Sequence, residues 1–279
     1  IPKILGNIAA ANIAIDYNIQ GPSFTVSTAC SSGGDAINTA CMCMQSGKAD
    51  IMLAVGAESV LCPLVIYSLA NAKALSRRND SPSTASRPFD VTRDGFVIGE
   101  GGGALVLETE EHALARGAKI YAEIRGCGNT DDAYHVTAPH PEGRGAIACM
   151  KQAIAEAGIN PSDIGYINAH GTATNKGDTV ETSSIKKVFG NTLPYVSSTK
   201  GATGHMMGAG GITETITCVK AIETGTVPPT INLNEVDPEC AGIDFVANTA
   251  KKAEINFAMS NAFGFGGQNS SIIVGKYGK

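Results

Sequence analysis

The chain has 279 residues, of which 43% are hydrophobic and 17% are charged, and its formal net charge at pH 7 is −5. The weak negative charge and the lack of a basic run argue against a nucleic-acid partner, and no apolar stretch approaches membrane-spanning length. This composition indicates a globular protein with a large core, in one large domain or two fused halves.

The eight cysteines indicate a reducing compartment. None of them forms a CxxC pair, and Cys41-x-Cys43 has no second half at the spacing of a metal site. Most lie within apolar segments, which is typical of reduced core thiols in a cytoplasmic enzyme. The first residues carry no initiator Met and no signal peptide, so we expect a chain that is entered partway.

Helix and strand signals alternate along the sequence. Helical spacing of apolar residues predicts a helix within 1–20, β-branched and aromatic residues predict a strand over 23–27, and helical spacing returns from Ser31 onward. The remaining predicted elements are a buried parallel strand over 50–56, a helix over 63–75, a surface loop over 77–87, a glycine turn from 96 that leads into a strand ending at 108, a helix over 109–116, a strand over 120–125, a loop over 129–143, helices over 146–157, 180–188 and 211–222, and strands over 164–169, 195–199, 257–261 and 271–274.

This alternation predicts an α/β fold with a mostly parallel sheet, and an internal repeat predicts two related halves. The strand-to-helix motif at 26–30 is similar to the one at 196–200, an offset of 196 − 26 = 170. A glycine turn before a strand occurs at 99 and again at 264, an offset of 264 − 99 = 165. We therefore place one half at residues 1–120 and the other at residues 121–279.

Cys30 lies at the first of these strand-to-helix turns, just before a predicted helix N-terminus. The unpaired N–H groups and the positive dipole end of a helix favour a thiolate. A nucleophilic cysteine is one interpretation of this position. A small core residue is the other, and for an arbitrary cysteine it is the commoner one.

Two histidines follow strands of the predicted second half, where ligands of open α/β sheets bind. His170 and His205 are candidates to donate hydrogen bonds to an enolate oxygen, and a cysteine nearby can accept an acyl group from a thioester. The glycine-rich loop 263–267 can bring a backbone N–H close to a carbonyl, and Lys200 and Glu214 can form a buried pair. Taken singly, each histidine is equally consistent with a structural role, and the loop with a tight turn or a phosphate cradle.

Four motifs occur in a distinctive order. They are Thr-Ala-Cys-Ser-Ser at 28–32, Asn-Ala-His-Gly-Thr-Ala-Thr at 168–174, Ser-Thr-Lys at 198–200 with Gly-His at 204–205, and Ser-Asn-Ala-Phe-Gly-Phe-Gly-Gly at 260–267. Together they resemble the β-ketoacyl-acyl carrier protein synthases, most closely the type II (elongating) condensing enzymes of the thiolase superfamily. The resemblance implies a thiolase-like α/β fold: two duplicated halves with mixed five-stranded sheets in a layered α-β-α-β-α arrangement.

The resemblance also implies an activity, the decarboxylative condensation of an acyl-enzyme with malonyl-acyl carrier protein to give 3-oxoacyl-acyl carrier protein and CO2 in fatty acid elongation. It implies no cofactor and no metal, an acyl carrier protein as partner, a homodimer and a cytoplasmic location. The implied roles are acylated nucleophile for Cys30, enolate stabilisation for His170 and His205, orientation of the site for Lys200 with Glu214 as its ion-pair partner, an oxyanion-hole amide and pocket gate for Phe265, contact with the phosphopantetheine arm for Thr172 and Thr174, and further substrate contacts for Phe263, Leu69 and Val65.

The sequence departs from the family pattern in several places. The family's opening strands and helices are missing, and Gln268 stands where the family usually has Thr. Val65, Tyr67 and Leu69 occupy a pocket region where elongating enzymes often carry glycines and a Phe, so we expect the accepted acyl chain to be shortened.

Lys73, Arg77 and Arg78 lie near the expected carrier-docking surface, although ordinary loop cations are an equal interpretation. The alternative functions are a polyketide-type or decarboxylase-only ketosynthase, and a non-catalytic chain-length-determining partner subunit.

Overall fold

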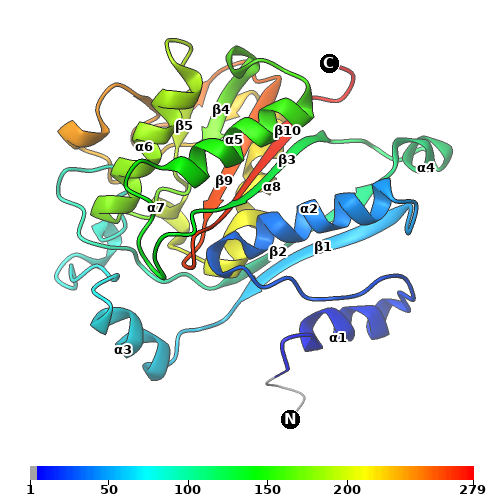
Figure 1. Ribbon diagram of the computed structural model, residues 1–279, viewed down its shortest axis with the longest axis horizontal. Coiled ribbons are helices and arrows are strands. Elements are labelled where there is room, and N and C mark those ends of the chain that lie inside the picture. The colour runs from blue at the N-terminus through cyan, green and yellow to red at the C-terminus, as the bar shows by residue number, and fades with distance from the viewer. Residues whose placement is uncertain (1–4) are drawn as a thin grey trace.

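The computed structural model describes residues 5–279, and a mixed six-stranded sheet lies at its centre (Figure 1). Its strands, in spatial order, are β3 (Glu123–Asp131), β10 (Gln268–Gly275), β9 (Phe257–Phe263), β4 (Ile164–Asn168), β5 (Tyr195–Ser197) and β7 (Asp244–Phe245). The pairs β9–β4, β4–β5 and β5–β7 are parallel, whereas β10 runs antiparallel to both of its neighbours. The sheet therefore has one strand more than the five that the family resemblance implies. The additional strand is β7 at the edge of the sheet, which is two residues long.

Helices cover both faces of this sheet. The helix α5 (Arg144–Ala157) packs on β3 and β10, and α6 (Asn175–Phe189) packs beside α5. On the opposite face, α8 (Gly210–Thr224) packs on β9, β10 and β4. Strand β10 shows why both faces are buried, since consecutive side chains of a strand point to opposite sides. Ile273 belongs to the same core as Met150 of α5, while Ile272 belongs to the same core as Ile212 of α8.

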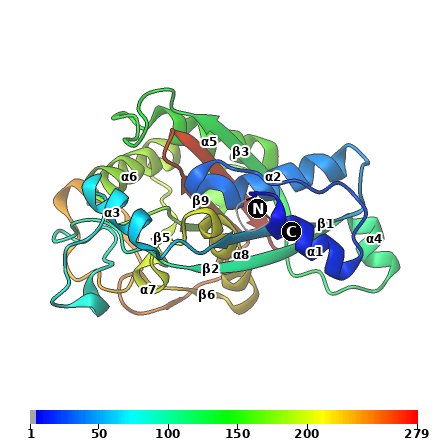
Figure 2. The same ribbon diagram turned by 90° about the horizontal axis from the view of Figure 1, so that it is seen from below.

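A smaller unit of one helix and two strands, α2 with β1 and β2, lies on the α8 side of the large sheet (Figure 2). The helix α2 (Ser32–Gln45) packs on β1 (Ile51–Glu58), which pairs antiparallel with β2 (Gly101–Glu108) along its whole length. The other segments of this part are α1 (Ile8–Tyr17), the turn η2 (Ala29–Ser31), α3 (Pro63–Asn71), the turn η3 (Pro82–Thr84) and α4 (Glu110–Ala115). The layers are thus α5 and α6, the large sheet, α2 and α8, and the β1–β2 pair.

Short elements complete the second part of the chain. They are η4 (Pro161–Asp163), α7 (Lys200–Thr203), η5 (Met207–Ala209), η6 (Pro238–Cys240), and the antiparallel pair of β6 (Thr226–Val227) and β8 (Lys251–Lys252). Among the helices that the model describes, none is both long and apolar enough to cross a bilayer.

The N-terminal ends of α2 and α8 meet at glycines. A Cβ atom on Gly33 would lie 2.7 Å from the backbone nitrogen of Ile212, and one on Gly211 would lie 2.5 Å from the backbone nitrogen of Gly34. No side chain fits at such distances, so only glycine allows the two helices to approach this closely. Each helix packs on the first strand of an antiparallel pair, β1–β2 or β9–β10, which is the arrangement expected of an internal repeat.

Most predicted elements are present, and three local predictions are wrong. Residues 23–27 form no strand, because no strand in residues 5–279 hydrogen-bonds with them. The apolar run at 50–56 forms an antiparallel rather than a parallel strand, because it pairs with β2. The glycines at 101–103 belong to β2 instead of preceding it, since they pair with the end of β1. The first residues of the predicted helix over 1–20 lie outside the described residues, and the helix itself spans Ile8–Tyr17.

Candidate active site

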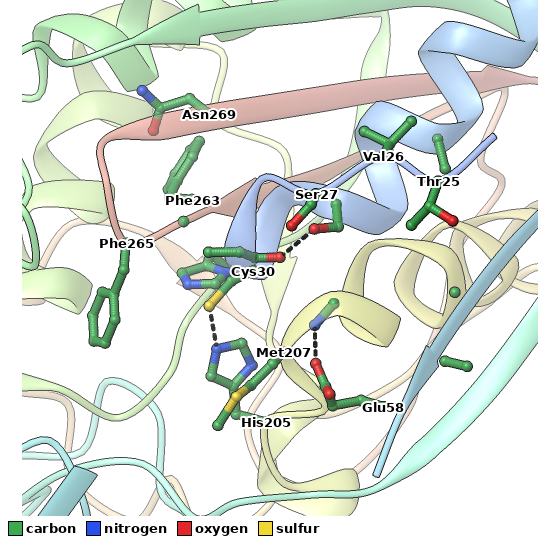
Figure 3. Close-up of a pocket in the computed structure, with 18 of the residues that line it drawn as sticks. Thr25, Val26, Ser27, Cys30, Glu58, His205, Met207, Phe263, Phe265 and Asn269 are labelled. Carbon is green, nitrogen blue, oxygen red and sulfur yellow. Dashed lines mark hydrogen bonds between the residues drawn. The ribbon is translucent and has the colours of Figure 1, made fainter. Parts of the chain in front are cut away.

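A cavity of about 1070 Å³ opens between the two parts of the chain. Its walls include Cys30 from the first part, and His170, His205 and Phe265 from the second. Figure 3 shows the Cys30 side chain pointing toward His205, with Phe263 and Phe265 nearby. Three chemically reactive side chains that are far apart in the sequence therefore share one cavity.

Cys30 lies in the η2 turn, immediately before α2. The glycine-rich loop packs against this turn, since a Cβ atom on Gly264 would lie only 2.7 Å from the carbonyl oxygen of Thr28. This close approach brings the backbone N–H of Phe265 to the side of the Cys30 sulfur, where it lowers the pKa of the thiol. The loop thus supplies a backbone donor beside the sulfur.

His205 contacts Cys30, and His170 lies beside His205. The Nε2 atom of His205 is 3.1 Å from the Sγ atom of Cys30. His170 follows β4, and its ring lies edge-on to the ring of His205 with 5.2 Å between centroids. The backbone N–H of His170 donates to the buried carboxylate of Glu181 at 2.8 Å, which fixes where the residue leaves the strand.

The electrostatics of the cavity favour neutral groups. Burial and the Lys200 ammonium hold the pKa values of His170 and His205 well below their usual range, so both imidazoles are neutral at pH 7. Burial also raises the pKa of the Cys30 thiol to about 11, and the Phe265 N–H offsets only part of this rise. The helix end favours a thiolate, but the burial of the sulfur acts in the opposite direction and is the larger effect on the pKa of Cys30.

Lys200 and Glu214 form an ion pair behind the histidines, and their side chains are only 2% and 4% exposed. Lys200 begins α7, and Glu214 lies on the first turns of α8. Burial raises the pKa of Glu214, while the nearby Lys200 charge counteracts this rise. The pair places one positive charge beneath the cavity, with its counter-ion on the side of α8.

The other residues singled out from the sequence lie in different places. Thr172, Thr174, Phe263 and Leu69 line the cavity, and the hydroxyls of the two threonines are 3.0 Å apart. Val65 lies one turn before Leu69 on α3 and is not among the residues of the cavity wall. Its expected substrate contact stays a prediction, since of α3 only the C-terminal end reaches the cavity in this structure.

Tyr67, the other bulky residue expected near the pocket, lies on the surface. Tyr67 is 71% exposed and does not line the cavity either. Of the three bulky residues at 65–69, only Leu69 is therefore positioned to limit a bound acyl chain.

Sequence reasoning missed several residues around the site. Glu58, at the end of β1, lines the cavity and accepts a hydrogen bond from the backbone N–H of Gly208 at 3.2 Å (Figure 3). Glu181 was not singled out as a partner of the His170 backbone, although an acidic residue on the helix after a His-Gly motif is a usable signal. Asp35, five residues after Cys30, was also missed.

Comparison with known proteins covers almost the whole chain. The models "Beta-ketoacyl synthase, N-terminal domain" and "Beta-ketoacyl synthase, C-terminal domain" match residues 1–113 and 121–234. A 3-oxoacyl-acyl-carrier-protein synthase 2 of Rhizobium meliloti is 48% identical over 99% of this chain and 66% of its own length. The corresponding Synechocystis protein is 47% identical over 99% of this chain and 67% of its own length. The chain thus spans about two thirds of the length of these relatives.

Solved structures agree with this result. The AntDE:AntF structure, a type II PKS acyl-carrier protein in complex with its ketosynthase, has a TM-score of 0.94 and 38% identity, over 97% of this chain and 67% of that one. A beta-ketoacyl synthase from Burkholderia phymatum has a TM-score of 0.93 and 39% identity, over 97% of this chain and 65% of that one.

Proposed function

Because the chain belongs to the beta-ketoacyl synthase family, we propose that it condenses an acyl group held on Cys30 with a malonyl group delivered by an acyl carrier protein. The product is a 3-oxoacyl-acyl carrier protein two carbons longer, as in fatty acid elongation. The observation that carries this proposal is the 3.1 Å contact between the sulfur of Cys30 and Nε2 of His205, in a cavity that also contains His170.

The first step is transfer of the acyl group to Cys30. The sulfur attacks the thioester carbonyl, a new C–S bond forms, and the bond to the carrier's sulfur breaks. Because the Cys30 thiol is protonated at rest, its proton must leave during the attack and reach the departing thiolate, while the Nε2–H group of His205 donates a hydrogen bond to the attacking sulfur. The backbone N–H groups of Cys30 and Phe265 serve as the oxyanion hole for the tetrahedral intermediate.

The second step is decarboxylation and condensation. Neutral His170 and His205, protonated on Nε2, donate hydrogen bonds to the thioester oxygen of the malonyl group. The C–C bond to the carboxylate breaks, CO2 leaves, and the electron pair forms an enolate at that oxygen. The enolate carbon then attacks the acyl carbonyl, a C–C bond forms, and the bond to the Cys30 sulfur breaks. The sulfur leaves as a thiolate and takes up a proton from solvent, because decarboxylation of the malonyl carboxylate releases none. Lys200 supports this chemistry, because its charge helps to keep the imidazoles neutral and stabilises the developing anion.

The surroundings of the cavity support a carrier-bound substrate. We assign Thr172 and Thr174 to the phosphopantetheine arm, since both line the cavity and offer hydroxyls. Lys73, two residues after the end of α3, also lines the cavity and would attract an acidic carrier protein. The division into halves at residue 120, assembly as a homodimer and a cytoplasmic location belong to the same proposal.

Mass spectrometry of the intact chain tests the first step. Incubation with an acyl-acyl carrier protein should add a single acyl group, and Cys30→Ala should abolish the adduct. Addition of malonyl-acyl carrier protein should then release CO2 and remove the acyl group from the protein. A folded chain that forms no adduct on Cys30 would contradict the proposal.

A second candidate is a polyketide-type ketosynthase, which is favoured by the structural match to a type II PKS ketosynthase. Product analysis with excess malonyl-acyl carrier protein and no reductase separates the two candidates. An elongating enzyme should stop after one condensation, whereas a polyketide-type enzyme should extend the 3-oxo product repeatedly. A non-catalytic chain-length-determining subunit should give neither product, and the presence of Cys30 with both histidines argues against it.

A further inference from the structure

The turn that carries Cys30 has an unusual backbone. Ala29 has a φ of +51°, in the left-handed region that residues with a Cβ atom rarely adopt. Such a conformation costs free energy and persists only where the surroundings hold it in place. The groups that hold Ala29 therefore also fix the direction of the Cys30 side chain.

Two serine hydroxyls form hydrogen bonds within the turn. The Ser32 hydroxyl donates to the carbonyl oxygen of Ala29 at 2.7 Å and accepts from the backbone N–H of Thr28 at 2.9 Å. The Ser31 hydroxyl is 2.7 Å from the carbonyl oxygen of Thr28. These bonds close the turn on itself, but they do not fix it to the rest of the protein.

Asp35 adds a buried hydrogen-bonded connection between the turn and β3, beside the packing of the glycine-rich loop. It lies on the first turn of α2, is 4% exposed, and accepts hydrogen bonds on both of its oxygens. Its Oδ2 atom accepts from the Thr28 hydroxyl at 2.5 Å and lies 3.2 Å from the Ser31 hydroxyl. Its Oδ1 atom accepts from the side-chain amide of Asn129 at 2.6 Å. One carboxylate therefore joins the residues on both sides of Cys30 to β3.

The hydrogen bond between Asp35 and Asn129 joins the two parts of the chain. Cys30 comes from the first part of the chain, whereas His205 and Phe265 come from the second, and Asn129 belongs to that second part as well. The bond between Asp35 and Asn129 thus crosses the same boundary as the contact between Cys30 and His205.

A simple helix-capping role does not account for these contacts. An acidic residue in the first turn of a helix stabilises the helix dipole wherever its carboxylate points. Here the carboxylate of Asp35 makes its hydrogen bonds to Thr28, Ser31 and Asn129, and none of these donors is a backbone N–H of the helix. A buried carboxylate with this set of donors is a fixed anchor.

We infer that Asp35 is a positioning residue for the nucleophile: it holds the strained Cys30 turn in its reactive geometry and fastens that turn to β3 through Asn129. This inference rests on the proposed function only in taking Cys30 as the reactive thiol.

The test compares Asp35→Asn with the unchanged chain, using iodoacetamide as the probe and peptide mapping to read each cysteine separately. The substitution removes a negative charge, which by itself would favour the thiolate and speed alkylation. Loss of position acts the other way, and a misplaced nucleophile also slows acylation by an acyl-acyl carrier protein. We expect both rates at Cys30 to fall by about 10- to 100-fold. Exposed Cys62 should react at an unchanged rate and serves as the internal reference.

An exchange of partners separates positioning from general stability. In Asp35→Asn combined with Asn129→Asp, the amide at 35 can donate to a carboxylate at 129, so the bond between the two parts is restored with reversed polarity. This double variant should recover most of the Cys30 reactivity. The matched control is Ile37→Val, which removes a methylene group from the buried side of the same helix and should leave the reactivity of Cys30 unchanged.

The outcomes are distinct. An Asp35→Asn chain that is folded by circular dichroism and alkylates Cys30 at the original rate overturns the inference, as does a double variant no faster than Asp35→Asn alone. If Asp35→Asn does not fold, Thr28→Val removes one donor only, and the same slowing or its absence decides the matter. A slow Asp35→Asn variant of a chain that performs no condensation would support the positioning role while refuting the proposed function.

Discussion

The ion pair of Lys200 and Glu214 allows a quantitative prediction. Glu214→Gln leaves the Lys200 ammonium 2% exposed with no carboxylate beside it. The nearest titratable neighbours offer little compensation, because His170 and His205 are neutral and burial raises the pKa of Glu181 to about 7. Breaking one side of a buried pair costs about 3–5 kcal/mol. For a chain of this size, that loss lowers the melting temperature by about 10 °C.

Urea unfolding followed by far-ultraviolet circular dichroism measures this loss, since the chain contains no Trp for fluorescence. The control is a double variant, Lys200→Met with Glu214→Leu, which buries neither charge. It should regain most of the lost free energy of unfolding, because two apolar side chains need no counter-ion. The reasoning is refuted if Glu214→Gln lies within about 1 kcal/mol of the unchanged chain, or if the double variant is no more stable than Glu214→Gln.

Three further predictions concern packing, pH and catalysis. Gly33→Ala places a Cβ atom 2.7 Å from the Ile212 backbone and should lower the free energy of unfolding in urea by at least about 1–3 kcal/mol, whereas Gly21→Ala, with nothing within 4 Å, should leave it unchanged. Because burial raises the pKa of Glu181 from 4.5 to about 7, the folded state holds this proton more tightly than the unfolded state does. Stability should therefore fall as the pH rises from 5 to 8, by up to about 3 kcal/mol for this group, and Glu181→Gln should flatten the profile measured by urea unfolding at each pH. His170→Ala should still allow acylation of Cys30 but slow CO2 release from malonyl-acyl carrier protein by about 10²- to 10³-fold, and equal slowing of both steps would contradict the assigned role.

The sequence allowed much of the fold to be predicted where a local signal decides the structure. The helix ending at Gly158 is an example, since its apolar spacing and its left-handed glycine cap both lie in the sequence. The strand over 50–56 shows the limit of such signals. An uninterrupted apolar run indicates burial, but the direction of a strand depends on its partner, which here begins 50 residues later at Gly101.

The candidate site divides in the same way. The motifs and the internal repeat predicted that Cys30 and His205 share a cavity, and the structure places their side chains in contact. The protonation of Cys30 was not predictable, because it depends on how deeply the sulfur is buried. The bond from Asp35 to Asn129 was not predictable either, since two residues 94 positions apart meet only when the two parts of the chain pack together.

The glycine contact between α2 and α8 has a mechanical consequence. Gly33 and Gly211 lie three and six residues after Cys30 and His205, so the point of closest approach between the helices lies beside the reactive groups. If one part of the chain rotates relative to the other about this contact, the displacement of each atom is proportional to its distance from the contact. The outer ends of the helices and the β1–β2 pair would then be displaced most, while the distance between the Cys30 sulfur and the His205 imidazole would change little. The spacing between the sulfur and the imidazole is therefore the feature of the cavity that such a rotation changes least.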